Sequence, residues 1–366
     1  MVTVQQLVDH LAAFAPLELA AEWDNVGLIL GDASSQVERV MTCLTITTAV
    51  VEEAIARRAD LVVSHHPVLF TAVKTLTTAT AEGRLLLPLL RQGVAVYSPH
   101  TAFDNCVGGI NDGLAARLGL QNVRPLRPRQ SKQYKLIVFV PETDLASVSD
   151  ALFAQGAGRI GNYERCSHRT SGIGTFTGND NANPSVGEKG IREEVREWRL
   201  EVVVPEGSLT TVVRAMQAAH SYEEPAYDVI ELAPKTSGGE GRVGDVFGSQ
   251  TLAETAVHLK EILQANCVQI IGDASKPLKR VAIACGAAGE FLSDAIRANA
   301  DVFVTGEMRF HHALAAEAAG VAVILTGHYA SERPAVEDLA AMLSAKFPNT
   351  EVWVSQAERD PIANII

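Results

Sequence analysis

The chain contains an internal repeat that relates a segment near its start to a segment near its end. Arg39-Val40 matches Arg280-Val281 at a shift of 241 positions. Ala59-Asp60 matches Ala300-Asp301 at the same shift. Parallel β-α-β units can resemble one another without common origin, but adjacent identities in one register favour two related segments. We therefore predict two α/β halves whose equivalent strand ends meet at one pseudo-symmetric cleft.

Three regions of the chain differ in their pattern of elements. Residues 1–125 and 242–366 alternate strands with helices of about ten residues, which predicts parallel β-α-β units. Residues 130–235 read as β-α-β-β-α-β, which is typical of a ferredoxin-like α+β domain. The polar stretches at 124–132 and 234–241 contain proline or glycine and predict linkers. The predicted fold class is α/β, with two related halves forming one domain that a ferredoxin-like insert interrupts.

Composition excludes several classes of protein. The net charge of −12 disfavours a nucleic-acid-binding surface but leaves a nucleotide substrate open, because a local positive centre can bind phosphate. The five cysteines are scattered without a CxxC pair, so we expect reduced thiols in a cytoplasmic protein. The N-terminal stretch predicts an amphipathic helix rather than a signal peptide, and no apolar run is long enough to span a membrane.

Two adjacent histidines stand at the end of a predicted buried strand. The apolar run Leu61–Val63 leads through Ser64 into His65 and His66, and Pro67 then ends the strand. Ligands of open α/β sheets bind at such strand ends. One interpretation is a core histidine beside an exposed one, because successive strand residues face opposite ways. The other is a turn at the strand end that lets both rings converge on a pair of metal ions.

The repeat brings further histidines and carboxylates to matching strand ends. His100 and Asp104 in one half parallel His328 and Glu332 in the other, with one residue of slippage. A spacing of four places His328 and Glu332 on one face of a helix. Imidazole and carboxylate together suit zinc, iron or manganese. The five candidate ligands are too many for one open tetrahedral zinc site and suit two metals, with Glu332 as the bridge: His65, His66, Asp104, His328 and Glu332.

Other residues near these strand ends have less specific patterns. His100 is our candidate catalytic residue, which would move protons beside the metals, and a turn residue is the alternative. Asp24 could face the site, but the turn pattern favours a capping role. His311-His312 falls in a predicted helix and is interpreted as structural or as the edge of the cleft. The glycines of Gly286–Gly289 are a weak candidate for phosphate binding.

Four motifs taken together resemble those of the GTP cyclohydrolase I type 2 homologue family, also called the NGG-interacting-factor-three-like family. They are Trp23-Asp24-Asn25-Val26-Gly27, Ser64-His65-His66-Pro67, His100-Thr101-xx-Asp104 and Gly327-His328-xxx-Glu332. The insert, including residues 219–228, resembles the PII-like middle domain of the longer bacterial members. The resemblance implies a dinuclear site held by the five candidate ligands, and a ring-shaped hexamer whose sites face an inner cavity.

The chain departs from this family at one position. Members often have Asp in the first strand-to-helix turn, where this chain has Leu44-Thr45-Ile46-Thr47. The departure affects any polar role of that turn but leaves the five candidate ligands unchanged.

Two functions are compatible with the motifs. The first is a metal-dependent hydrolase that acts on a small molecule such as a nucleotide through a metal-activated water. The second is a non-catalytic metal-binding protein or regulatory scaffold whose insert binds a ligand or a partner. The metal ligands support both, and a turnover assay separates them.

Overall fold

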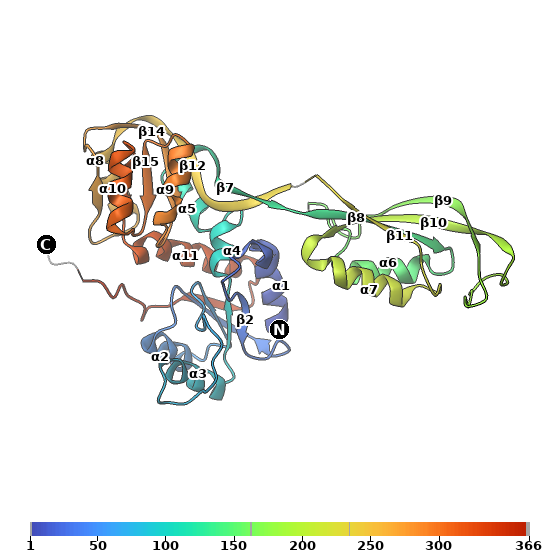
Figure 1. The fold of residues 1–366 in the computed structure, drawn as a ribbon. Helices are drawn as coiled ribbons and strands as arrows, with labels where there is room; N and C mark the ends of the chain where they lie inside the picture. The colour runs from blue at the N-terminus through green and yellow to red at the C-terminus, as the bar shows by residue number, and fades with distance from the viewer. Residues whose placement is uncertain (1, 162, 234, 364–366) are drawn as a thin grey trace. The chain divides into compact units, whose positions relative to one another are not determined.

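The computed structural model describes residues 2–161, 163–233 and 235–363, and Figure 1 shows its ribbon. The chain forms two compact units. The larger consists of Met1–Arg129 and Ser237–Ile366, and the smaller of Gln130–Thr236. Over the described residues the fold is mixed α/β with eleven α-helices, none of which is long and apolar enough to cross a membrane.

The first sheet of the larger unit has five strands in the order β17-β4-β5-β6-β2. The first four run parallel, and β2 pairs antiparallel with β6. All four residues of the central strand β5 are buried, as suits an apolar, β-branched strand covered on both faces. The strands are β2 (Gly27–Leu30), β4 (Arg39–Cys43), β5 (Leu61–Ser64), β6 (Ala95–Ser98) and β17 (Glu351–Val354), with a separate pair β1 (Val2–Thr3) and β3 (Gln36–Val37). The helices are α1 (Val4–Phe14), α2 (Thr48–Ala56), α3 (Ala81–Arg91), α4 (His100–Asn105) and α5 (Ile110–Arg117).

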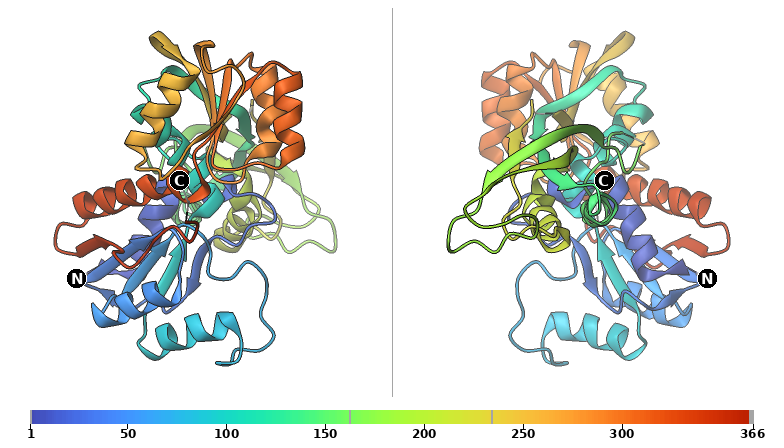
Figure 2. Two further views of the ribbon diagram at one scale, coloured as in Figure 1. Left: turned by 90° about the vertical axis from the view of Figure 1, so that its left-hand side faces the viewer. Right: turned by 90° about the vertical axis from the view of Figure 1, so that its right-hand side faces the viewer.

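The second sheet of the larger unit has the order β13-β16-β15-β14-β12-β7. Its central strands β14, β15 and β16 are parallel. The strands are β7 (Gln121–Ser131), β12 (Lys235–Thr251), β13 (Gln269–Ile271), β14 (Pro277–Ala284), β15 (Val302–Thr305) and β16 (Ala322–Leu325). The helices are α8 (Leu252–Ile262), α9 (Leu292–Arg297), α10 (Phe310–Ala318) and α11 (His328–Lys346). Helix α11 follows β16 and packs against α5, β4 and β17, so it joins the second sheet to the first (Figure 2).

The repeat positions make equivalent contacts in the two sheets. Asp60 Oδ2 accepts the backbone N–H of Arg39 at 2.9 Å, and the N–H of the preceding residue at 2.8 Å. Asp301 Oδ2 accepts the backbone N–H of Arg280 and that of its preceding residue at the same two distances. These matching contacts support our interpretation that the two segments are related.

The stretches that we predicted to be linkers are strands. Residues 124–132 fall largely within β7, and residues 235–241 begin the long strand β12, which neighbours β7 in the second sheet. The prediction failed because proline and arginine are typical of linkers, whereas an edge strand such as β7 tolerates both.

The smaller unit is a four-stranded antiparallel sheet in the order β11-β8-β10-β9, with two helices. The sequence order β-α-β-β-α-β with this strand order is the ferredoxin-like arrangement. Alternate residues of β8 and β10 pack with both helices in one apolar cluster, which explains the period-two pattern of the strands. The elements are β8 (Gln133–Pro141), α6 (Leu145–Ala154), β9 (His168–Thr177), β10 (Arg192–Pro205), α7 (Leu209–Ala219) and β11 (Tyr227–Glu231).

Candidate metal centre

The two adjacent histidines converge because the chain continues beside β4 after β5 ends. The His65 N–H donates to the carbonyl of Cys43 at 2.9 Å, and the His66 N–H donates to the carbonyl of Leu44 at 2.8 Å. The two ring centroids are 5.0 Å apart. The two rings therefore do not point apart, as they would if one lay in the core and the other in solvent. Both imidazoles are available to one site.

The other three predicted ligands lie around this pair. Asp104 is on α4, and its Oδ1 is 3.5 Å from His65 Nε2. Both His328 and Glu332 are on the first turns of α11, where a spacing of four places them on one face. Glu332 Oε2 is 3.1 Å from His66 Nε2 and 3.2 Å from His328 Nε2. All five side chains thus meet at one place, although they come from three segments of the larger unit.

Several atoms of this cluster are buried without a hydrogen-bond partner among the described residues. They are both ring nitrogens of His65, Oδ1 of Asp104 and Oε2 of Glu332. An unsatisfied buried polar atom costs about 1–3 kcal/mol, so native structures rarely keep several together. A divalent cation would satisfy the two carboxylate oxygens and one ring nitrogen of His65, whose other nitrogen keeps its proton. The donor set and its burial therefore fit bound metal.

The electrostatics of the cluster differ between its members. The Glu332 carboxylate raises the pKa of His328 to about 9, so this ring must lose a proton before it binds a metal. Burial lowers the pKa of His65, which keeps its ring neutral with a lone pair free for a metal. Burial opposes ionisation of Glu332, but the His328 and His66 imidazoles outweigh it and lower the pKa of that carboxyl. Burial also raises the pKa of Asp104, and a cation would reverse this by stabilising the carboxylate. Burial thus keeps His65 neutral, the form that binds a metal, and disfavours the charge of Asp104 until a cation is present.

His66 and His328 direct Nε2 at Glu332, and each makes a second polar contact through Nδ1. His328 Nδ1 is 2.9 Å from Glu307 Oε1. His66 Nδ1 is 2.7 Å from the hydroxyl of Thr45. Such outer contacts fix the orientation of metal-binding imidazoles. Glu307 occupies the position that matches His66 in the internal repeat. The repeat could therefore have indicated Glu307, but we assigned this residue no role.

Asp24 caps its own turn, because Oδ1 accepts the Asn25 N–H at 2.8 Å, and it also faces the site through a contact with His100. Its side chain is fully buried, and Oδ1 is 2.8 Å from His100 Nδ1, while Oδ2 accepts the N–H and the hydroxyl of Thr101. His100 has a φ of +29°, which is strained for a residue with a Cβ and is typical of functional positions. Its ring centroid is 5.2 Å from that of His65 and 5.5 Å from that of His66. Asp24 therefore orients the candidate catalytic ring.

Replacing Asp24 by asparagine is expected to destabilise the protein by about 2 kcal/mol at pH 7. Burial opposes the charge of Asp24, but the bonds from His100 and Thr101 lower its pKa from 3.8 to about 2. A lowered carboxyl pKa stabilises the fold above pH 3.8, and this stabilisation is lost as the pH falls through about 2. Urea unfolding would measure the free energy of unfolding of Asp24→Asn and of the native chain. The difference between these two free energies should shrink as the pH is lowered from 7.

The exposed Asp9 offers a control for this measurement. Asp9→Asn should change the free energy of unfolding by less than about 0.5 kcal/mol at either pH. A difference between Asp24→Asn and the native chain that stays constant down to pH 2 would show that the Asp24 charge has no such role.

The remaining sequence candidates do not join the cluster. His311 and His312 begin α10 and belong to neither group of potential metal ligands found among the described residues. Gly286 has a φ of +72°, and a Cβ there would lie 2.2 Å from Glu332 Oε1. The glycine thus makes room for the Glu332 carboxylate, which is a role different from phosphate binding.

Comparison with known proteins agrees with these motifs. The model of the family described as Duf34/NIF3 (NGG1p interacting factor 3) matches residues 2–361. A Bacillus subtilis protein named GTP cyclohydrolase 1 type 2 homolog is 37% identical over 363 residues, covering 98% of this chain and 97% of that protein. Its namesake from Halalkalibacterium halodurans is 35% identical over 366 residues, covering 99% and 98%.

A solved structure extends the agreement to the fold. The crystal structure of a Bacillus cereus protein related to NIF3 aligns with a TM-score of 0.79 and 33% identity, covering 100% of this chain and 99% of the other. The family resemblance of the four motifs is therefore confirmed, and the chain belongs to the DUF34/NIF3 family.

Proposed function

We propose that the protein is a dinuclear metal-dependent hydrolase that acts on a nucleotide or a related small molecule. The observation that carries the proposal is the set of buried, unpartnered atoms on His65, Asp104 and Glu332. Zinc, iron or manganese would suit these imidazoles and carboxylates. Such ions, when bound, supply Lewis-acid activation of water. We expect Glu332, which lies between His66 and His328, to be shared by the two ions.

His100 is suited to hold and move a proton in this site. Asp24 engages its Nδ1, so Nε2 is the nitrogen that remains to accept or donate a proton. A buried carboxylate that contacts one ring nitrogen fixes the orientation of the imidazole and the position of its proton. This arrangement supports the role that we assigned to His100 from the sequence.

Two exposed aromatic side chains beside His100 support a substrate with a flat ring. Trp23 is 67% exposed, and its ring centroid lies 6.0 Å from that of His100. Phe70 is 53% exposed, with its centroid at 5.6 Å. Exposed aromatic rings stack on nucleobases of any sequence. A nucleotide could thus place its base here and its phosphates near the cations, in a protein that is otherwise acidic.

A turnover assay tests the proposal. The metal-loaded protein would be incubated with nucleotides, including the GTP that the relatives' names suggest, and with phosphoesters. We expect metal-dependent turnover of at least one substrate, and a loss of at least about 100-fold in kcat for His100→Gln, as for other acid–base residues. His311→Gln, outside the cluster, is the control. Absence of turnover across the panel, with full metal occupancy, would reject the enzymatic function.

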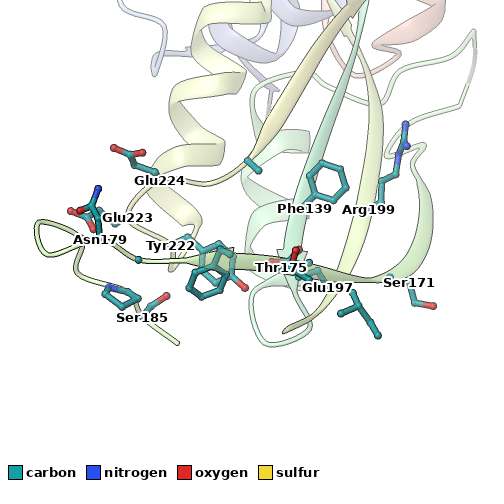
Figure 3. Close-up of a pocket in the computed structure, with 18 of the residues that line it drawn as sticks. Phe139, Ser171, Thr175, Asn179, Ser185, Glu197, Arg199, Tyr222, Glu223 and Glu224 are labelled. Atoms are coloured by element: carbon teal, nitrogen blue, oxygen red, sulfur yellow. The ribbon is translucent and has the colours of Figure 1, made fainter. Parts of the chain in front are cut away.

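A cavity in the smaller unit favours the second candidate function, a regulatory or metal-binding scaffold. The cavity measures about 770 Å³ and lies against β9 and β10 (Figure 3). Phe139, Phe176 and Tyr222 contribute aromatic rings, and Glu197 contributes a carboxylate. The Tyr222 hydroxyl is buried without a hydrogen-bond partner among the described residues, so a ligand could satisfy it. This cavity supports our interpretation of the insert as a PII-like ligand-binding domain.

A binding assay on the full chain addresses this second function. Isothermal titration with nucleotides would be run on the metal-free protein and on Tyr222→Phe, which keeps the ring and removes the hydroxyl. Binding that Tyr222→Phe weakens, without any turnover, would favour the scaffold. Binding that is unchanged by this substitution would place the ligand outside the cavity.

We also propose that the chain acts in the cytoplasm as a ring-shaped homohexamer, as the family resemblance implies. All five cysteines are free thiols, which supports a reducing compartment. Light scattering on the purified protein measures the assembly directly, and a monomeric mass would reject the ring.

A further inference from the structure

His66 contacts different partners with its two ring nitrogens. Nε2 lies 3.1 Å from Glu332 Oε2 and therefore faces the metal centre. Nδ1 lies 2.7 Å from Thr45 Oγ1, in the turn that follows β4. A metal ion takes the lone pair of one ring nitrogen, so the other nitrogen must then carry the proton. The partner of Nδ1 consequently decides how easily His66 presents Nε2 to a metal.

The turn that carries Thr45 is itself held by a buried carboxylate from the end of the chain. Glu358 Oε1 accepts the Thr45 N–H at 2.6 Å, and Oε2 accepts the Leu44 N–H at 3.0 Å. The Glu358 side chain is only 3% exposed, and its Oε2 lies 3.2 Å from Nε of Arg333 on α11. The turn is thereby tied to the helix that carries His328 and Glu332.

We propose that Thr45 is a positioning residue for His66, and that Glu358 acts through Thr45 by fixing the turn. In the metal-bound state the Thr45 hydroxyl accepts the Nδ1–H of His66, which leaves the Nε2 lone pair directed at the cation. Without metal the same hydroxyl can donate to Nδ1 while Nε2–H faces Glu332. A hydroxyl supports both tautomers, whereas an ionised carboxylate only accepts.

Thr45 lies in the turn between β4 and α2. Its side chain is neutral, so it adds no charge to the centre, while Glu358 brings its carboxylate to the backbone of the turn rather than to the ring. The inference rests on the proposed metal centre, but not on whether the protein catalyses a reaction.

The test is the affinity of the full-length protein for Zn²⁺, measured by competition with a chromophoric chelator. We expect Thr45→Val to weaken one Zn²⁺ site by about 10–100-fold, the usual effect of removing such an outer contact. Thr45→Ser, which keeps the hydroxyl, should restore an affinity near that of the native chain. Because residue 45 is exposed, these changes should leave the unfolding of the metal-free protein unaltered. Thr48→Val makes the same chemical change at an exposed position three residues away and is the control.

Each outcome decides a different claim. Native protein that binds no Zn²⁺ would overturn the metal centre itself. Native affinity in Thr45→Val, or a loss in Thr45→Ser as large as that in Thr45→Val, would overturn the role of the hydroxyl alone. Glu358→Gln should weaken Zn²⁺ binding in the native chain but add no further loss to Thr45→Val. An additive loss would show that Glu358 acts by another route.

Discussion

Replacing Glu332 by alanine is expected to abolish the high-affinity binding of metal while the fold stays intact. Oε2 of this side chain lies within 3.2 Å of both His66 Nε2 and His328 Nε2, so its removal takes away the anion that draws a cation to these imidazoles. The loss should exceed the roughly 10–100-fold effect typical of outer contacts. Elemental analysis of the purified protein would report the metal content, and circular dichroism would report the fold.

The same helix provides a matched control for this substitution. Glu337 is one and a half turns further along α11, is 64% exposed and pairs with Arg333 rather than with a histidine. Glu337→Ala should therefore retain the native metal content. Equal metal content in Glu332→Ala and Glu337→Ala would reject Glu332 as a ligand, and with it the bridging role that we propose.

Replacing Arg242 by methionine should destabilise the larger unit by about 3 kcal/mol, because it removes the buried partner of an ion pair whose other side chain, Asp112, is 25% exposed. Arg242 is 2% exposed and binds Asp112 through Nε and Nη2, at 2.5 and 2.8 Å. The guanidinium also donates to the backbone carbonyls of Cys106, Gly239 and Gly241. Methionine fills similar space but removes the donor of three carbonyls and leaves the Asp112 carboxylate with only the Gly108 N–H as a donor among the described residues.

Urea unfolding followed by circular dichroism would measure this effect. Arg280→Met is the control, because Arg280 pairs with Asp245 where both side chains are more than a third exposed. Such a pair contributes about 0–1 kcal/mol. If Arg242→Met loses no more stability than Arg280→Met, the buried pair does not hold the segments around α5 and β12 together.

The sequence predicted the central features of the site because they are local or repeated. The strand before His65 is apolar and β-branched, and a spacing of four places His328 and Glu332 together on a helix wherever that helix lies. The internal repeat then indicated that the two groups meet. Family resemblance implied the same five candidate ligands and added the expectation of a hexamer.

The residues that the sequence did not reveal act through contacts between distant segments. Asp24 lies in a turn-like stretch, and its contact with His100 spans 76 positions. Glu358 and Thr45 are separated by 313 positions, and an acidic residue in a C-terminal stretch is usually solvated. Strand β7 was missed because its proline and arginine favour a linker, and only pairing with β12 makes it a strand. In each case the partner that determines the role of the residue or strand lies far away in the sequence.

The distribution of the five side chains along the polypeptide has a consequence for biosynthesis. His65, His66 and Asp104 leave the ribosome before the whole insert is made, whereas α11 emerges only after the insert. A nascent chain at that stage carries His65, His66 and Asp104 but lacks the Glu332 carboxylate that would complete the proposed centre. Stable capture of metal by the proposed centre would thus mark a chain translated through α11, and a product truncated before α11 would lack this stabilisation.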